Sequence, residues 1–437
     1  MQDRPLHEVV DLTDPSRQFL HNATLEEARA AVASGDPLRI RALKGDFALV
    51  ARDGENVRLA RSLSRPLRYF LAKGPDGPVL IVSERIDAIA AELSRRGWSA
   101  QFHASYTRMV PAHHILTLRL IGCPDPGPTA ERFFTPAMGI FGTDKAALGK
   151  RYVEAAAHEI AEWLGAVDAK EPIGVSFSGG VDSGMVLLLL DHVLRQKGQS
   201  PSRLKAFTLA VDGGGEDVLQ ARSFLEKTGL SYYHEPLEVP RSALSPRDAV
   251  RIVEDYKPLD LQAATMALAL CRAVRTRYPD WKLLLDGEGG DENFKDYPLE
   301  PGAEVTIRSV LSNPLLYHEG WGVTALKHSA TYSGGLSRGI TRSYATAVAC
   351  GFSPFSPLTR PAVVEAAEGI PFVALTGWKE EALYRLKGEV VSSGIRAVTG
   401  REMPVFPKRR FQDGASEEVL LPSQESAWRE LFHELHG

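Results

Sequence analysis

The pattern of apolar and polar positions changes character about one third of the way along the chain. Before residue 120, short alternating segments separated by Gly, Asp and Asn predominate, at 46–51, 57–61, 67–72 and 78–83. Alternation with a period of two predicts strands that bury one face. We therefore expect the amino-terminal part to be a meander of short strands with a few helices.

After residue 145 the pattern predicts helices that alternate with short buried strands. We expect helices at 145–166, from about 183 and at 216–228, and strands at 173–177, 205–211 and 281–287. This alternation is typical of parallel βαβ units. The second part is therefore expected to be a doubly wound α/β domain with a parallel sheet, followed from about residue 300 by helices and loops.

A stretch rich in proline and glycine separates the two parts. Residues 121–142 contain four prolines and four glycines and lack helical periodicity, which is typical of a linker. We expect an amino-terminal domain at 1–122, a linker at 123–145 and a second domain at 146–437.

The segment SFSGGVDSG joins a predicted strand to a predicted helix. Such a loop presents backbone N–H groups at a helix N-terminus, where phosphate binds well, and its glycines permit close approach. Asp182 would repel a bare phosphate, which indicates bound magnesium. The alternative is a polar turn with a capping Asp or Ser. The candidate phosphate-binding residues are Ser176, Ser178, Gly179, Gly180, Asp182 and Ser183.

A second acidic loop, LLLDGEGGDENF, follows the predicted strand at 281–287. It places Asp286, Glu288, Asp291 and Glu292 within seven residues, and these carboxylates repel one another unless a cation or proton offsets them. Asp291 is the candidate second magnesium ligand beside Asp182. Glu288 is the candidate for acid–base work or for holding an amine. The alternative is an Asp/Gly-rich turn that binds no metal.

Together these two segments resemble a known family. SGGVDS resembles the loop of ATP pyrophosphatases, and with DGEGGDENFKDY it is similar to the synthetase domain of asparagine synthetase B and its relatives, among them β-lactam synthetases and lasso-peptide cyclases. The family pattern is close to SGEGxDExFxGY, from which Asp286 and Asp296 depart. The resemblance implies an ATP pyrophosphatase (PP-loop) fold and the cofactors ATP and Mg²⁺.

The resemblance also assigns roles to further residues. Leu209 and Val211 would flank the adenine, and Asp286 and Gly287 would lie at the ATP. In PKRRFQDGAS, Lys408 fits the family's lysine, which is followed by Phe411, Asp413 and Gly414. That lysine stabilises negative charge as the chemistry proceeds. Without the resemblance, residues 408–410 are a solvated basic turn. Asp217 fits both the family's second helix and an ordinary helix start.

The amino-terminal part resembles the family's glutamine amidotransferase domain, an α+β Ntn-hydrolase-like fold. That domain uses a cysteine directly after the initiator methionine as nucleophile. Here residue 2 is Gln2, and ARSLSRPL lacks the Asp and Gly of the family's Arg-Asp-x-x-Gly. We expect a degenerate domain without glutaminase activity that acts as a structural lid. His103, His113 and His114 are expected to have surface or packing roles rather than to bind a metal.

Composition narrows the function classes. Lys plus Arg number 51 and Asp plus Glu 55, for a net charge of -4, which argues against nucleic acid as the main partner. The three cysteines lie far apart, which argues against a disulfide framework or zinc site. No signal-peptide or membrane-spanning run stands out, so we expect a cytoplasmic protein. The resemblance makes a homodimer conceivable, but nothing in the sequence fixes the oligomeric state.

The expected function is an ATP-dependent amide synthetase. It would adenylate a small-molecule carboxylate or a peptide, release pyrophosphate, and pass the acyl group to ammonia or an amine, within or between molecules. CGFSPF replaces the family's Glu-x-Arg-x-Pro-Phe, with Cys350 and Phe352 at the charged positions, which puts aspartate in doubt as substrate. The alternatives are a catalytically inactive binding homologue and an adenylating enzyme that acts on RNA.

Overall fold

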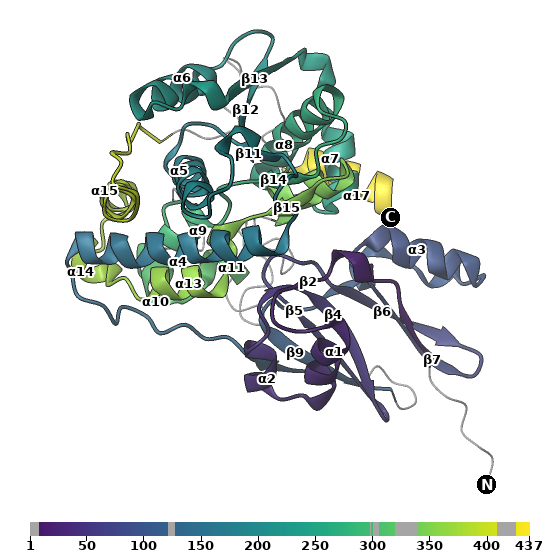
Figure 1. Ribbon diagram of the computed structural model, residues 1–437. Helices are drawn as coiled ribbons and strands as arrows, with labels where there is room; N and C mark the ends of the chain where they lie inside the picture. Colours follow the sequence, from purple (N-terminus) through teal and green to yellow (C-terminus); the bar gives the residue numbers. More distant parts are fainter. Residues whose placement is uncertain (1–7, 121–126, 298, 300–305, 320–339, 409–424) are drawn as a thin grey trace.

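The computed structural model describes residues 8–120, 127–297, 299, 306–319, 340–408 and 425–437. It has two parts, a smaller one built on mostly antiparallel strands and a larger one in which helices surround a parallel sheet (Figure 1). Among the described residues, none of the helices combines the length and the apolar character that crossing a bilayer requires.

The amino-terminal part contains two four-stranded sheets. One has the order β1 (Glu8–Asp11), β7 (Gly77–Ser83), β6 (Arg68–Gly74) and β8 (Arg108–Met109). The other has the order β10 (Thr129–Arg132), β9 (His114–Arg119), β5 (Asn56–Arg61) and β4 (Ala48–Asp53). The predicted strands at 46–51, 57–61, 67–72 and 78–83 are thus confirmed with small shifts of their ends.

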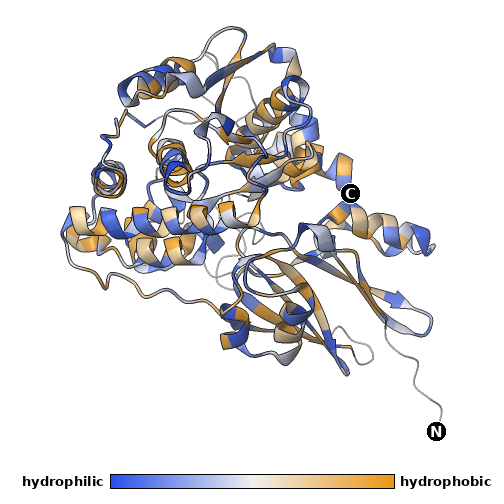
Figure 2. Cartoon of the chain, in the orientation of Figure 1, coloured by the Kyte–Doolittle hydropathy of each residue, from blue (hydrophilic) through white to orange (hydrophobic). Residues whose placement is uncertain are grey.

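The two sheets bury one face against each other and the other against helices. Leu59 and Leu116 of one sheet and Leu80 of the other share a core. Helices α1 (Leu25–Ser34) and α2 (Pro37–Arg41) cover the outer face of the β4–β5–β9 sheet, and α3 (Ile86–Arg95) covers the other. Figure 2 shows hydrophobic residues along these strands. Apolar side chains thus cover both faces of these strands, whereas the alternation in the sequence predicted strands that bury one face.

The stretch at 121–142 is not wholly irregular. Residues 121–126 lie outside the described residues, but Thr129–Arg132 forms β10 and pairs antiparallel with β9. The chain then runs along the outside of the larger part to the start of α4 (Figure 1). On the way, the N–H groups of Gly139 and Phe141 donate to the carbonyl oxygens of Glu368 and Gly369. Part of the expected linker is thus an edge strand, and part is tied to the larger body.

The larger part is built on a five-stranded sheet in which all neighbours run parallel. Its order is β13 (His234–Val239), β12 (Leu204–Val211), β11 (Ile173–Ser176), β14 (Leu283–Leu285) and β15 (Ser353–Phe355). Helices lie on both faces, so the prediction of a doubly wound α/β domain is confirmed. The predicted helix at 145–166 is also confirmed as α4 (Lys145–Ala166), whose first N–H groups are capped by Asp144.

Two groups of helices cover the two faces of the parallel sheet. On one face lie α4, α5 (Val181–Gln196), α6 (Glu216–Thr228) and α15 (Glu381–Thr399). On the other lie α8 (Pro258–Arg277) and α12 (Ala345–Ala349), with α7 (Pro246–Val253) packed on α8. In the described part of the chain, the other α-helices are α9 (Gly290–Phe294), α10 (Ile307–Ser312), α11 (Leu316–Glu319), α13 (Pro361–Glu368), α14 (Phe372–Thr376) and α17 (Glu425–His436), and η7 (Ile340–Tyr344) is a π-helical turn.

The strand order fixes where a ligand site can form. From β11 the chain adds β12 and β13 on one side, then returns to add β14 on the other side of β11. The loops that leave β11 and β14 therefore diverge at the carboxyl end of the sheet. This reversal of strand order opens a crevice, which is where ligands bind in open α/β sheets.

Charged side chains join the two parts. Asp46 accepts two hydrogen bonds from the Arg360 guanidinium, at 2.5 and 2.6 Å, and both side chains are buried. Buried His113 contacts Glu319 at 2.7 Å between Nδ1 and Oε1, which agrees with its expected packing role. The His103 side chain caps a short 3-10 turn, and His114 Nδ1 forms a hydrogen bond with the Ala112 carbonyl oxygen.

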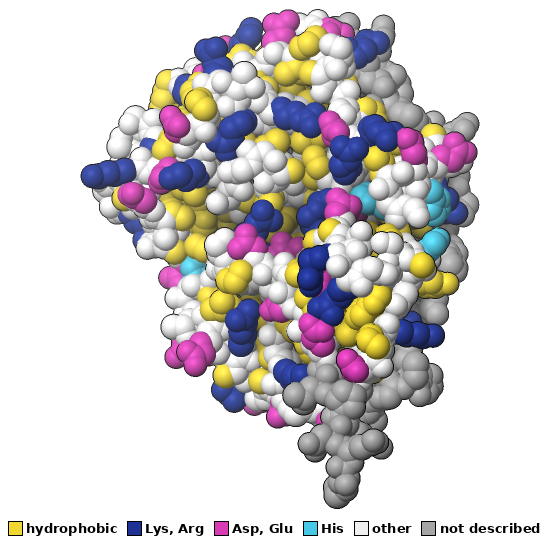
Figure 3. All heavy atoms as spheres, turned by 90° about the vertical axis from the view of Figure 1, so that its right-hand side faces the viewer, with side chains coloured by type: hydrophobic (Ala, Val, Ile, Leu, Met, Phe, Trp, Pro, Cys, Tyr) yellow, Lys and Arg dark blue, Asp and Glu magenta, His cyan; other side chains and the backbone are white. Residues whose placement is uncertain are grey.

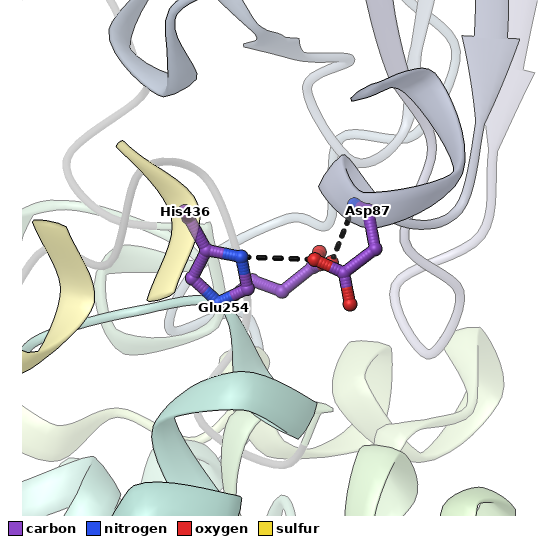
Figure 4. A group of neighbouring side chains, drawn as sticks. All are labelled: Asp87, Glu254 and His436. Atoms are coloured by element: carbon purple, nitrogen blue, oxygen red, sulfur yellow. Dashed lines mark hydrogen bonds and ion pairs between the residues drawn. The ribbon is translucent and has the colours of Figure 1, made fainter. Parts of the chain in front are cut away.

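A third contact between the two parts contains three side chains of the types that bind metal ions. Asp87, Glu254 and His436 each offer one ligand atom within 4.8 Å of the others (Figure 4). Glu254, however, already accepts the Ile86 N–H and pairs with Arg68 at 3.3 Å and Arg85 at 3.2 Å. Because these arginines already balance the buried carboxylate, we assign this group a role in joining the two parts.

The Asp46–Arg360 pair should contribute strongly to stability because it is buried. Replacing Asp46 with Ala leaves a buried guanidinium without its counter-ion, and we expect the free energy of unfolding to fall by about 3–5 kcal/mol in urea titration. The matched control is Arg41→Ala, which breaks the partly exposed Arg41–Glu365 pair between the same two parts and should cost only about 0.2–1 kcal/mol. Equal losses for the two variants would contradict this assignment.

Candidate active site

The loop after β11 has the geometry of an anion-binding turn. Gly180 is the N-cap of α5, and no described side chain caps the first N–H groups of that helix. Gly179 has φ +74°, and a Cβ there would lie 2.8 Å from the backbone of Ala221 in α6. The Ser178 N–H donates to Ser183 Oγ at 3.3 Å, which closes the turn. The loop therefore needs glycine at 179 both for its conformation and for its approach to α6.

The acidic loop after β14 lies directly against this turn. A Cβ on Gly287 would lie 2.7 Å from the Ser183 nitrogen, and one on Gly290 would lie 2.1 Å from Asp182 Oδ1. The two glycines therefore let the two loops meet without side chains between them. The structure brings together the two motifs that the sequence singled out, although Asp182 and Asp291 are more than one hundred residues apart in the chain.

Lys387 lies between the carboxylates of these loops. Its Nζ is 2.5 Å from Asp182 Oδ2, 2.5 Å from Asp291 Oδ1 and 3.5 Å from Asp296 Oδ2, and the side chain is buried. Lys387 comes from α15, on the face of the sheet that α5 also covers. One ammonium group is thus shared by three carboxylates.

Lys408 approaches the same carboxylates from the irregular segment after α15. Its Nζ is 2.6 Å from the carbonyl oxygen of Asp296, 3.0 Å from Asp296 Oδ2 and 3.2 Å from Asp291 Oδ1. Phe411, Asp413 and Gly414, which accompany Lys408 in the motif, lie outside the described residues. The structure therefore places the predicted lysine at the site. Of the residues that the motif assigns, Lys408 is the one that lies within the described part of the chain.

Burial and shared cations determine the charge state of this cluster. Burial raises the pKa of Asp182 to about 6 and that of Asp296 to about 7, because Lys387 cannot fully compensate three carboxylates at once. Burial also opposes ionisation of Asp291, but Lys387 and Lys408 outweigh it and hold the pKa of Asp291 well below its ordinary value. The carboxylates in turn raise the pKa of Lys387, which burial alone would lower.

A second charged cluster lies on the other side of the acidic loop, around Arg342 of η7. The Arg342 guanidinium is 2.9 Å from Glu288 Oε2 and 2.7 Å from Glu292 Oε1, and it donates to the Tyr297 hydroxyl at 2.7 Å. Tyr297 donates to Glu292 Oε1 at 2.6 Å. Glu288 thus has a fixed cation beside it, and about a fifth of its side chain, 22%, remains exposed.

Glu288 is the carboxyl group of this cluster best suited to proton transfer. Burial raises its pKa to about 8; Arg342 opposes that rise, and Glu292 and Asp286 add to it. A carboxyl group that titrates near neutral pH suits a general acid or base. Asp286 has a different task, because its Oδ1 accepts the Ser356 hydroxyl at 2.6 Å and the Glu288 N–H at 3.1 Å. Asp286 therefore shapes the loop that presents Glu288.

Leu209 and Val211 lie deeper than an adenine contact would suggest. Both side chains are buried in the core between β12 and α8. At the end of β11, the Phe177 N–H donates to the Phe207 carbonyl at 2.8 Å, so the β12 backbone runs beside the phosphate loop. Any contact of Leu209 or Val211 with a nucleotide would thus come from the backbone. Asp217 lies buried in the first turn of α6.

Two residues of the site were missed by the sequence analysis. Lys387 lies on the apolar stripe of α15 with Leu383, Leu386, Val390 and Val391, all buried. A lysine on an apolar stripe is a signal that could have been found, because a buried ammonium needs buried carboxylates. Arg342 offers no such signal, since η7 is a single turn with no periodic pattern around it.

Lys387 should hold the carboxylate cluster in place. At pH 8 we expect Lys387→Met to lower the free energy of unfolding by about 3–5 kcal/mol, because buried carboxylates lose their cation. Without Lys387 the pKa values of Asp182 and Asp296 in the folded state, which already lie above the ordinary value, rise further, so the folded protein binds more protons and the loss should shrink toward pH 5. Denaturant titrations at both pH values measure this. Lys145→Met, which breaks an exposed pair with Glu389 between α4 and α15, should change stability by under about 1 kcal/mol at either pH.

One comparison with known proteins bears on this site. Residues 165–343 match the family model described as asparagine synthase. The match includes the phosphate loop, the acidic loop and Arg342, whereas Lys387 and Lys408 lie beyond it. A search of curated proteins found no match. The family match supports an asparagine synthetase-like assignment of this segment, an enzyme, and ATP-dependent amide-bond or amidation chemistry in general.

Proposed function

We propose that the protein is an Mg-ATP-dependent amide synthetase that forms an acyl-adenylate, releases pyrophosphate and passes the acyl group to ammonia or an amine. The observation that carries the proposal is the meeting of the phosphate loop, the acidic loop, Lys387 and Lys408 at the carboxyl ends of β11 and β14. A turn with bare N–H groups, opposed carboxylates and two cations suits a magnesium triphosphate.

Magnesium fits the residues that are present. Asp182 Oδ1 has no hydrogen-bond partner among the described residues and belongs to a carboxylate facing Asp291 across Lys387. Carboxylate oxygen is the ligand type that Mg²⁺ prefers. Asp182 and Asp291 would hold the ion, which would neutralise phosphate charge during attack at the α-phosphorus. Lys387 and Lys408 add fixed positive charge where the pyrophosphate leaves.

The Arg342 cluster suits the second half-reaction. Glu288 lies on the acidic loop, three residues before Asp291, so a group held by Glu288 lies near the proposed adenylate. In its ionised form Glu288 would accept a proton from the attacking amine, and Arg342 would fix its orientation.

Phe352 is buried under the Arg275 guanidinium, whose carbon lies 4.1 Å from the ring centroid, and Arg275 also donates to the Cys350 carbonyl at 2.9 Å. These contacts tie CGFSPF into the fold, and the loss of both charged residues from this stretch favours an acid other than aspartate.

We propose that the amino-terminal part is a degenerate glutaminase-like domain that serves as structural support. The segment that replaces the family's Arg-Asp-x-x-Gly contributes buried Arg65, which pairs with Glu84, and Ser64, which donates to Asp46. Asp46 in turn holds Arg360 of the larger part. These residues connect the two parts, which supports a scaffold role without glutamine hydrolysis.

Small molecules or a peptide, rather than nucleic acid, are the proposed partners. Acidic and basic side chains are interspersed over the face in Figure 3, without one large basic surface. The net charge of -4 adds no general attraction for phosphate backbones. An RNA substrate would instead require a basic track toward the site.

Nucleotide product analysis tests the proposed reaction. The protein is incubated with Mg-ATP, ammonium or other amines and a panel of carboxylic acids, with and without glutamine. We expect AMP and pyrophosphate in equal amounts with one class of acid, unchanged by glutamine. Asp182→Ala and Lys408→Ala should lower turnover by about 10²–10³-fold, whereas Lys282→Ala, an exposed lysine, should not. ADP as product, or no turnover together with no pyrophosphate binding, would refute the proposal.

The pH dependence of amide formation tests the role of Glu288. Only the ionised carboxyl group accepts a proton, so the rate per concentration of free amine should rise with pH and level off above about 8, the pKa of Glu288. Glu288→Gln should lower that rate by about 10²–10⁴-fold and remove the rise, while pyrophosphate release in the first step persists. An unchanged profile in the variant would exclude Glu288 as the base.

A further inference from the structure

Asp296 adds a carboxylate where the family pattern has glycine. It follows α9 and is buried beneath both lysines of the site. Its Oδ2 is 3.0 Å from Lys408 Nζ and 3.5 Å from Lys387 Nζ. Neither the proposed adenylation nor the proposed amide formation uses this group, so its contacts with the two lysines need an explanation.

Both lysines keep other anchors if the Asp296 side chain is removed. Lys387 retains Asp182 and Asp291, each at 2.5 Å. Lys408 retains Asp291 Oδ1 at 3.2 Å and the backbone carbonyl of residue 296 at 2.6 Å, which every substitution preserves. The Asp296 carboxylate is therefore not required to place the lysines. Its specific contribution is negative charge beside them.

That charge changes the balance of the pyrophosphate end of the site. Asp182, Asp291 and Asp296 carry three negative charges when ionised, against two positive charges on Lys387 and Lys408. Without Asp296, the two negative charges of Asp182 and Asp291 would balance the two positive charges of the lysines. A buried carboxylate about 3 Å from an ammonium competes with any other anion for that ammonium, and the competition is strong where water is excluded.

We propose that Asp296 is a positioning residue that competes with pyrophosphate for Lys387 and Lys408 and thereby promotes release of this product. The inference rests on the proposed adenylating function, because it assigns the leaving group to the lysine pair. As pyrophosphate departs, the two ammonium groups return to the contacts with Asp296 that the structure shows. A glycine at this position would leave the lysines more strongly attracted to the product.

Equilibrium binding of magnesium pyrophosphate and of AMP to the full chain tests this role. Titration calorimetry at pH 8 compares wild type with Asp296→Asn and Asp296→Gly. We expect both variants to bind pyrophosphate about tenfold more tightly or better, with AMP affinity within twofold of wild type. Glu381→Gln, an exposed carboxylate on the same helix as Lys387, controls for the change in net charge and should leave both affinities unchanged.

The outcomes separate this inference from the proposed function. Unchanged or weaker pyrophosphate binding in both variants would overturn the role of Asp296 while leaving the adenylating function intact. Equal changes in pyrophosphate and AMP affinity would indicate a general disturbance of the site and would also overturn it. If wild type and variants all fail to bind pyrophosphate, the proposed function fails and the inference fails with it.

Discussion

The candidate site depends on one arrangement, a buried lysine shared by carboxylates from two different loops. Asp182 belongs to the first turn of α5, Asp291 to α9, and Lys387 to the long helix α15. Like charges at this separation would repel the two loops if no cation lay between them. Lys387 therefore holds together the crevice that the strand order opens.

Glycines permit this arrangement, and polar contacts fix it. Gly287 and Gly290 allow the acidic loop to lie against α5, while Gly289, with φ +96°, turns the loop over Leu358 and Thr359. Asn293 of α9 then donates to Tyr152 and to the Leu358 carbonyl, and its own oxygen contacts His318. The carboxylates are thus carried by a short helix whose neighbours are all buried, so little reorganisation is needed when charge develops at the site.

The amino-terminal part is joined to this framework through segments that follow the site. Arg360 comes five residues after the end of β15 and contacts Asp46, and Glu319 follows His318 and contacts His113. Arg65 lies over the ring of Tyr344, two residues from Arg342, with its guanidinium carbon 5.9 Å from the ring centroid. These contacts make the stability of each part depend on the other, because buried charges of the amino-terminal part have their partners in the larger part.

The sequence by itself determined many of the helices and strands and the two loops that form the site. Periodicity gave α4 and the strands closely, and the residue types in SFSGGVDSG and DGEGGDENF indicated phosphate and cation chemistry, because those signals are local. It could not supply Lys387, Arg342 or the role of Asp296, whose partners lie far away in the chain. It also placed β10 in a linker, since an edge strand of four residues in a proline-rich stretch has no distinct pattern. Only the tertiary structure decided which charges share one buried volume, because pairing between distant charges depends on strand order and helix packing rather than on neighbouring residues.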